Sequence, residues 1–230
     1  MRPKRISYIR WRSYMINFFS KRKNEININE MDVSEKKTEH ILEESKTLGD
    51  LAKSGHLFFR FSQSKPGRSV ENVYAEYIPG KITEAMDEDK YLSFVTEETI
   101  AICFMYGDML TSLKFDLNDE DFKKIADTPF KYTGNSLGEY ESKYLLVENN
   151  FSLEDINTIA MLFDYVTSTQ QLITIFNFSF GSLEERLHEF KYYESERLVR
   201  YLKKEFDKNI YITPDEIRSL IKRYMREQGD

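Results

Sequence analysis

The chain changes character near residue 150, and this change limits the folds that it can adopt. Before that point, short apolar and aromatic runs such as His56–Ser62 are separated by turn residues. After it, Ser152-Leu-Glu-Asp155, Ser182-Leu-Glu-Glu185 and Thr213-Pro-Asp-Glu216 are three capping-box starts, each followed by helical periodicity. The pattern predicts an α+β protein with a mainly helical C-terminal part.

Local signals predict the individual elements. Strands are expected over His56–Ser62, Tyr74–Ile78, Tyr91–Val95, Met109–Asp116 and Tyr140–Val147. Helices are expected over Thr38–Lys53, from the N-cap Thr96 to Gly107, and after the N-cap Asn118. The apolar and aromatic segment Gln171–Phe180 fits a strand or a buried helix, and periodicity does not separate these two.

The sequence divides into three regions: a basic arm and polar linker over 1–37, an α+β region over 38–150 and a mainly helical region over 151–230. Met1–Lys23 carries eight basic residues and no acid. Its segment Ile6–Phe19 would suit a helix on an anionic membrane or a nucleic-acid backbone. The alternatives are a partly ordered tail, or a helix packed on the body through Trp11 and Phe18. The net charge of -6 argues against a protein that coats nucleic acid.

Several classes of site are excluded by composition and spacing. The lone Cys103 allows no internal disulfide, and its apolar neighbours indicate a core position. The histidines His40, His56 and His188 lack metal-ligand spacing, and no glycine-rich phosphate loop is present. No stretch approaches the roughly 20 apolar residues of a membrane span, and no signal peptide is recognised, so a cytoplasmic protein is expected.

Three dispersed segments could belong to one site. Arg60 lies in the strand-like Phe58-Phe-Arg-Phe-Ser62, Ser93 lies in Leu92-Ser-Phe-Val-Thr96 before a short helix, and Glu139 and Glu141 form a Glu-x-Glu pair. In this order they resemble the arginine–serine–glutamate pattern of the NAD-dependent ADP-ribosyltransferases, over roughly residues 55–150. The family's Ser-Thr-Ser triplet is replaced here by Ser93-Phe94-Val95, and nearly ninety residues follow Glu141.

The resemblance implies a mainly antiparallel, split β centre and a mono-ADP-ribosyltransferase with NAD as substrate and no metal. Arg60 would bind the diphosphate, Ser93 would support the site and Glu141 would stabilise the ribosyl cation. Glu139 would activate the acceptor, Phe94 would lie beside nicotinamide, and His56 is a secondary candidate for contact with the ribose. The implied partners are a macromolecular acceptor, protein or nucleic acid, and an antitoxin or inhibitor protein, as for a toxin or phage-borne modifier.

Each residue also has a structural interpretation. Arg60 could lie on the solvent face of a half-buried strand, Ser93 could simply precede a helix cap, and the two glutamates could belong to a solvated acidic face. The alternative function is a non-enzymatic protein that binds a protein partner, nucleic acid or a membrane surface through its basic arm and helical C-terminus.

Overall fold

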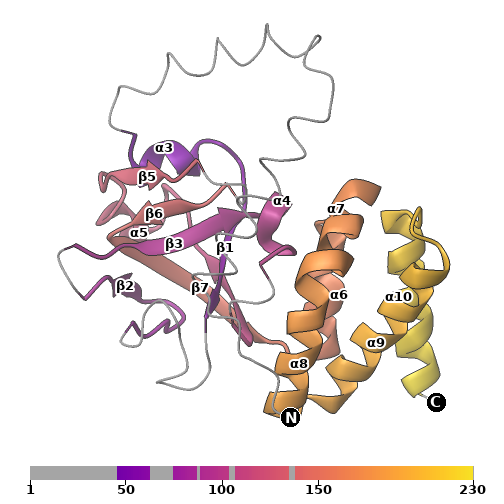
Figure 1. The fold of residues 1–230 in the computed structure, drawn as a ribbon. Coiled ribbons are helices and arrows are strands. Elements are labelled where there is room, and N and C mark those ends of the chain that lie inside the picture. The colour runs from indigo at the N-terminus through magenta and orange to yellow at the C-terminus, as the bar shows by residue number, and fades with distance from the viewer. Residues whose placement is uncertain (1–45, 63–74, 87–88, 104–106, 135–137, 230) are drawn as a thin grey trace, which may run out of the picture.

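The computed structural model describes residues 46–62, 75–86, 89–103, 107–134 and 138–229 (Figure 1). The predictions for the basic arm, the linker and the part of the first helix before residue 46 lie outside these residues. The remainder of that helix is the short α3, Leu48–Ala52.

The centre of the molecule is a seven-stranded sheet in which every pairing is antiparallel, in the order β2-β7-β4-β1-β3-β6-β5. Its strands are β1 (Phe58–Ser62), β2 (Ile82–Glu84), β3 (Leu92–Thr96), β4 (Met109–Leu113), β5 (Phe130–Tyr132), β6 (Tyr140–Ser142) and β7 (Tyr144–Ser152). Together with the helices that follow, the sheet confirms the predicted α+β class.

The sheet consists of two half-sheets that meet along a short seam. β1 pairs with β4 along its whole length, from Phe58 to Ser62, whereas it pairs with β3 only at Phe58↔Thr96 and Phe59↔Val95. The rest of β3 pairs with β6 instead. Beyond the seam, β2-β7-β4-β1 and β3-β6-β5 are therefore not held together by ladder hydrogen bonds.

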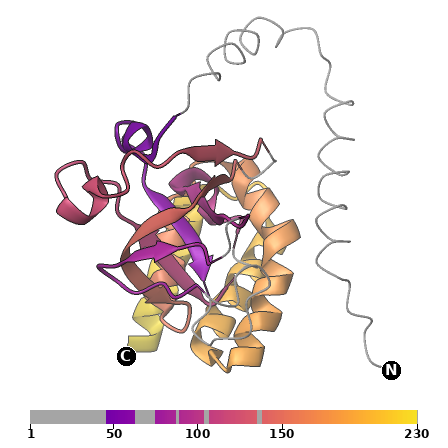
Figure 2. The same ribbon diagram turned by 90° about the vertical axis from the view of Figure 1, so that its left-hand side faces the viewer.

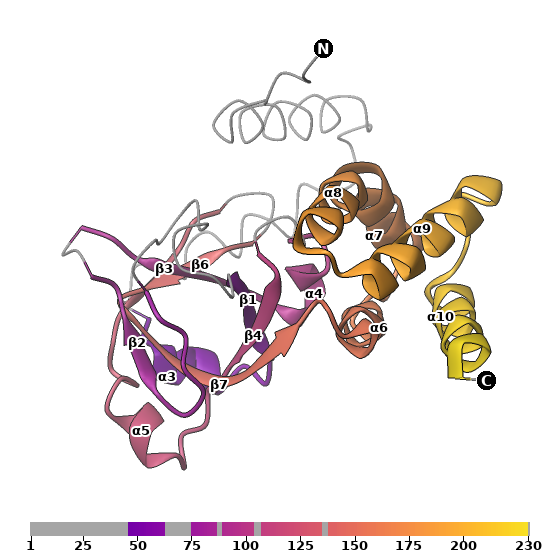
Figure 3. The same ribbon diagram turned by 90° about the horizontal axis from the view of Figure 1, so that it is seen from below.

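The C-terminal helices lie beside the sheet, next to β1, β4 and the end of β7 (Figures 1 and 3). They are α6 (Ile156–Asp164), α7 (Thr169–Thr174), the π-helical turn η3 (Ile175–Ser179), α8 (Phe180–Phe190), α9 (Tyr193–Lys208) and α10 (Pro214–Gly229). Phe59 and Phe61 of β1 share one buried cluster with Leu162, Phe176 and Leu202 of these helices. Viewed from the sheet side, the sheet lies in front of the helices (Figure 2). No helix in the described residues has both the length and the apolar character to cross a membrane.

A second buried cluster includes residues of α3 and of α5 (Glu120–Lys123), two helices that lie on the side of the sheet away from α6 to α10 (Figure 3). Phe58 and Phe94 occupy its centre, and Leu48 and Phe122 from the two helices close it. Rings pack closely here, with Phe58 at 4.3 Å from Phe115 between centroids. The sheet therefore has a separate core on each side.

Two strand predictions differ from the structure. Residues 75–78, the described part of the predicted strand Tyr74–Ile78, form no strand, and the two edge strands β2 and β5 had no prediction. The expected strand Tyr140–Val147 is two strands, because Lys143 interrupts the pairing and β6 and β7 pair with different neighbours.

Of the three capping boxes predicted from the sequence, one begins a helix in the structure. The box at Thr213 is confirmed, since Thr213 N donates to Glu216 Oε2 (2.7 Å) and Glu216 N donates to Thr213 Oγ1 (3.3 Å). The box at Ser152 is wrong, because Asp155 caps α6, and Ser182 lies inside α8. Ser168 caps α7 through a box with Gln171.

Two further helix boundaries differ from the predictions, and one segment whose secondary structure was left open is a helix. The cap of α5 is Asp119, not Asn118, because the Asp119 carboxylate accepts from two backbone N–H groups. α4 (Glu97–Ile100) ends well before Gly107. Gln171–Phe180 is helical throughout, so the buried-helix alternative holds.

Candidate functional site

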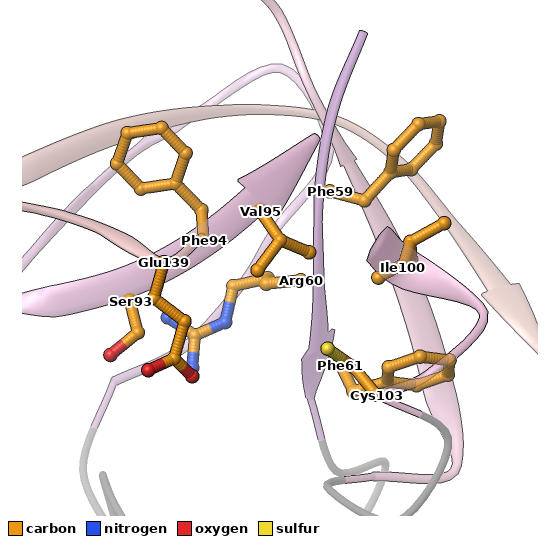
Figure 4. A pocket seen from close by; sticks show the side chains of 9 residues that line it. All are labelled: Phe59, Arg60, Phe61, Ser93, Phe94, Val95, Ile100, Cys103 and Glu139. Atoms are coloured by element: carbon orange, nitrogen blue, oxygen red, sulfur yellow. The ribbon is translucent and has the colours of Figure 1, made fainter. Parts of the chain in front are cut away.

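A small pocket opens beside the seam between the half-sheets (Figure 4). It is lined by residues of β1, β3 and the chain around α4, together with Glu139: Phe59, Arg60, Phe61, Ser93, Phe94, Val95, Ile100, Cys103 and Glu139. Its volume of about 30 Å³ leaves room for roughly two or three water molecules. Four predicted site residues, Arg60, Ser93, Phe94 and Glu139, thus line one pocket.

Arg60 is buried, with 8% of its surface exposed, which excludes the solvent-facing interpretation. Within the described residues, its Nε and Nη1 have no hydrogen-bond acceptor, and its Cζ lies 4.2 Å from the centroid of the Tyr77 ring. Burial of a charge without acceptors costs several kcal/mol by order of magnitude. The site therefore holds a cation whose hydrogen-bonding capacity is partly unused.

Ser93 and Glu141 are direct cross-strand partners on β3 and β6, so their side chains share one face of the sheet. Lys131 of β5 is the other neighbour of Glu141 in the same row. The Lys131 ammonium lies over the Tyr91 ring instead, at 3.7 Å from its centroid. In the part of the chain that the structure describes, the Glu141 carboxylate has no hydrogen bond or ion pair. Glu141 does not line the pocket itself.

Glu139 lies just before β6, where the chain is fixed by Thr133. The N–H and the hydroxyl of Thr133 both donate to the Glu139 carbonyl, at 2.9 and 3.1 Å. In Figure 4, the Glu139 carboxylate, the Ser93 hydroxyl and the Arg60 guanidinium extend into the same space. An acid, a hydroxyl and a guanidinium from three separate segments therefore converge.

Phe94 and His56 do not take the places that the resemblance implies. The Phe94 ring is 1% exposed and packs on Tyr140 at 5.6 Å between centroids, pointing away from the pocket, so it has no free face for nicotinamide (Figure 4). Burial in this cluster raises the pKa of Tyr140. His56 precedes β1 and its Nδ1 lies 3.1 Å from Glu97 Oε1 at the surface, outside the pocket lining.

The C-terminal helices hold the pocket wall that contains Ile100 and Cys103. Gln171 Nε2 donates to the Glu98 carbonyl (3.0 Å), and Ser179 Oγ donates to the Ile102 carbonyl (2.7 Å). Glu98 belongs to α4 and Ile102 follows its C-cap, so these two hydrogen bonds join α4 and the residues after it to the C-terminal helices. Cys103 is 4% exposed, as expected for a core residue.

Sequence analysis missed Tyr77, which contacts the Arg60 side chain directly. The alternation of Tyr74–Ile78 indicates a strand, and no local signal shows that an aromatic ring there lies against a distant arginine. Among the described residues, no cluster of three or more His, Cys, Asp or Glu side chains could hold a metal ion.

Comparisons with known proteins add nothing to this geometry, since no family model, no curated protein and no solved structure matches the chain.

Proposed function

We propose that the protein is a mono-ADP-ribosyltransferase that transfers ADP-ribose from NAD to a macromolecular acceptor in the cytoplasm. One observation carries the proposal: the buried Arg60 guanidinium has unused donors in the same pocket as Ser93 and Glu139. Arginine donors favour a diphosphate, whose oxygens supply the missing acceptors. Ser93 lines the pocket and is the cross-strand partner of Glu141, which supports a role for the two residues in contacting the ribose that follows the diphosphate.

Each polar group has a role in the proposed reaction. The bond between nicotinamide and C1′ of the ribose breaks, and nicotinamide leaves with the electron pair. The Glu141 carboxylate stabilises the oxocarbenium-like ribose by charge and by a hydrogen bond to a ribose hydroxyl, and Ser93 positions that carboxylate. Glu139 accepts the proton of the acceptor group as it attacks C1′.

The pocket must widen to admit NAD, because small-molecule sites usually have volumes of about 300–1,000 Å³. Parting of β1 from β3 beyond Phe59 and Val95 breaks no ladder hydrogen bond between these strands. A split sheet with a buried cation at its opening is therefore compatible with entry of a dinucleotide.

The test is incubation of the purified full chain with labelled NAD and cell lysate. We expect a labelled acceptor and released nicotinamide, and Glu141→Gln should lower the rate at least about a hundredfold, as loss of a transition-state charge partner does. Glu154→Gln, at an exposed position outside the pocket, is the matched control. Full activity of Glu141→Gln would remove Glu141 from its role.

A non-enzymatic interaction protein is the second candidate, favoured by the exposed turn between α9 and α10. Ile210 and Tyr211 there are 49% and 75% exposed, and apolar surface of this kind suits a protein partner. In that case NAD would not raise the melting temperature, and Tyr211→Ser would weaken binding of the partner.

A further inference from the structure

A row of polar side chains crosses the sheet on the face that carries Arg60. The register places Arg60 of β1 opposite Thr111 of β4, and Thr111 opposite Asn150 of β7. Ser62, two residues after Arg60, belongs to the same face. Thr111 is completely buried, so this row places polar groups in the interior of the fold.

These side chains form a continuous chain of hydrogen bonds. Ser62 Oγ lies 2.8 Å from Thr111 Oγ1, Thr111 Oγ1 donates to Asn150 Oδ1 (2.7 Å), and Asn150 Nδ2 donates to the Tyr77 carbonyl (2.7 Å). This series of hydrogen bonds thus leads from β1 to the segment 75–78, which is not a strand of the sheet. It ends on the residue whose ring contacts Arg60.

A second side-chain hydrogen bond, from β2, fixes the same segment. Thr83, a buried residue of β2, donates its hydroxyl to the Glu76 carbonyl at 2.8 Å. The carbonyls of Glu76 and Tyr77 are therefore both bound by side chains of sheet strands, instead of by a backbone ladder. This explains how an irregular segment keeps an aromatic ring in one place.

We propose that Tyr77 is a wall of the anion site and that Thr111 and Asn150 are positioning residues that act through it. The inference rests on the proposed function in one respect, that Arg60 binds the diphosphate. The Tyr77 ring covers one face of the guanidinium by a cation–π contact. This contact limits rotation of the side chain and leaves Nε and Nη1 to point at the ligand in a fixed direction.

The mechanism predicts that loss of the chain of hydrogen bonds weakens anion binding without removing any group that touches the anion. Thr111→Val keeps the shape of the side chain and removes the hydroxyl that joins Ser62 to Asn150. Tyr77→Leu removes the ring and leaves the backbone carbonyl in place. Ser112→Ala is the matched control, because Ser112 also lies on β4 but bonds Glu148 and Asn149, with no link to Tyr77.

The experiment is calorimetric titration of the full chain and its variants with inorganic pyrophosphate and with NAD. Thr111→Val and Tyr77→Leu should each weaken both affinities roughly five- to tenfold, and Ser112→Ala should change them less than about twofold. In the Arg60→Lys background, which lacks the planar group that stacks on Tyr77, Thr111→Val should have less than about a twofold effect.

The outcomes separate this inference from the proposed function. Equal losses from Thr111→Val in the wild-type and Arg60→Lys backgrounds would show general structural damage and would overturn the positioning role. Unchanged affinity of both Thr111→Val and Tyr77→Leu, with normal binding by the wild type, would overturn the inference alone. Failure of the wild type to bind pyrophosphate or NAD would overturn the proposed function as well.

Discussion

The two sides of the sheet bury different kinds of side chain. On the helix side, Phe59 and Phe61 pack against apolar residues of α6 to α10 in one large cluster. On the other side, an aromatic cluster around Phe58 and Phe94 fills only part of the surface, and the polar row with Arg60 and Thr111 occupies another part.

The difference separates burial that stabilises the fold from burial that needs another explanation. Apolar area removed from water contributes about 25 cal/mol per Å², so the helix-side cluster is accounted for by folding alone. The buried guanidinium on the opposite side costs stability, since its Nε and Nη1 lack acceptors in the described residues. In the proposed function, a ligand supplies the acceptors that these two nitrogens lack.

The largest expected effect is on the helix side. Phe176 is 2% exposed and stacks on Phe206 at 4.4 Å between centroids. Phe176→Ala should lower the free energy of unfolding by about 3–5 kcal/mol, measured by urea denaturation, because the lost ring leaves a cavity. Tyr211→Ala, at a 75% exposed position, is the control and should stay within about 0.5 kcal/mol of the wild type. Equal losses of unfolding free energy in the two variants would show that the buried cluster on the helix side does not stabilise the fold more than an exposed residue does.

On the opposite side of the sheet, a substitution at Arg60 should raise the free energy of unfolding instead of lowering it. Arg60→Met removes the buried charge and keeps much of the volume, so it should raise the free energy of unfolding by about 1 kcal/mol or more in the absence of ligand. The same variant should lose binding of NAD and pyrophosphate. Denaturation and calorimetry on one preparation measure both effects. A destabilised Arg60→Met would show that the guanidinium serves the fold.

A smaller effect is expected where the helices hold the pocket wall. Ser168 accepts from Gln171 N at 3.2 Å, and Gln171 in turn bonds the carbonyl of Glu98. Ser168→Ala should lower stability by about 1 kcal/mol, as loss of an N-cap usually does, and Ser168→Asp should retain most of it. Urea denaturation of the three proteins measures this. Identical denaturation midpoints for the three proteins would mean that the Ser168 cap does not stabilise the C-terminal helices.

The smallest expected effect is the pH dependence of stability that comes from Asp119, the cap of α5. The Lys114 ammonium and two backbone N–H groups hold the pKa of Asp119 at about 2, below its usual 3.8. This depressed pKa stabilises the folded state above about pH 4, and the contribution is lost as the pH falls towards about 2. The melting temperatures of the wild type and Asp119→Asn should therefore converge between about pH 5 and pH 2. A constant difference would exclude the ionised carboxylate as its source.

The sequence was informative where the determinants are local. The α+β class, the strand around Arg60 and the box at Thr213 all follow from short-range patterns, and each is present. The boxes at Ser152 and Ser182 failed for different reasons. α6 begins later, with Asp155 as its cap, and Ser182 lies inside a continuous helical run that begins after the cap Ser168.

The candidate site was predictable only in part. Strand residues such as Arg60 and Ser93 could be identified by type, and the structure brings them to one pocket with Glu139. The orientation of Phe94 follows from strand alternation, because the adjacent residues Ser93 and Phe94 of β3 point to opposite faces of the sheet. Tyr77 was not predictable, since its place depends on side-chain bonds from strands far along the chain.

The seam at Phe58 and Phe59 has a consequence for engineering. Beyond Phe59 and Val95 no ladder joins β1 to β3, and the side chains of Val95 and Ile100 line the pocket beside these strands. Trimming or enlarging those residues therefore adjusts the width of the opening while the ladders on either side stay intact. The chain offers a pocket whose size can be tuned by single substitutions.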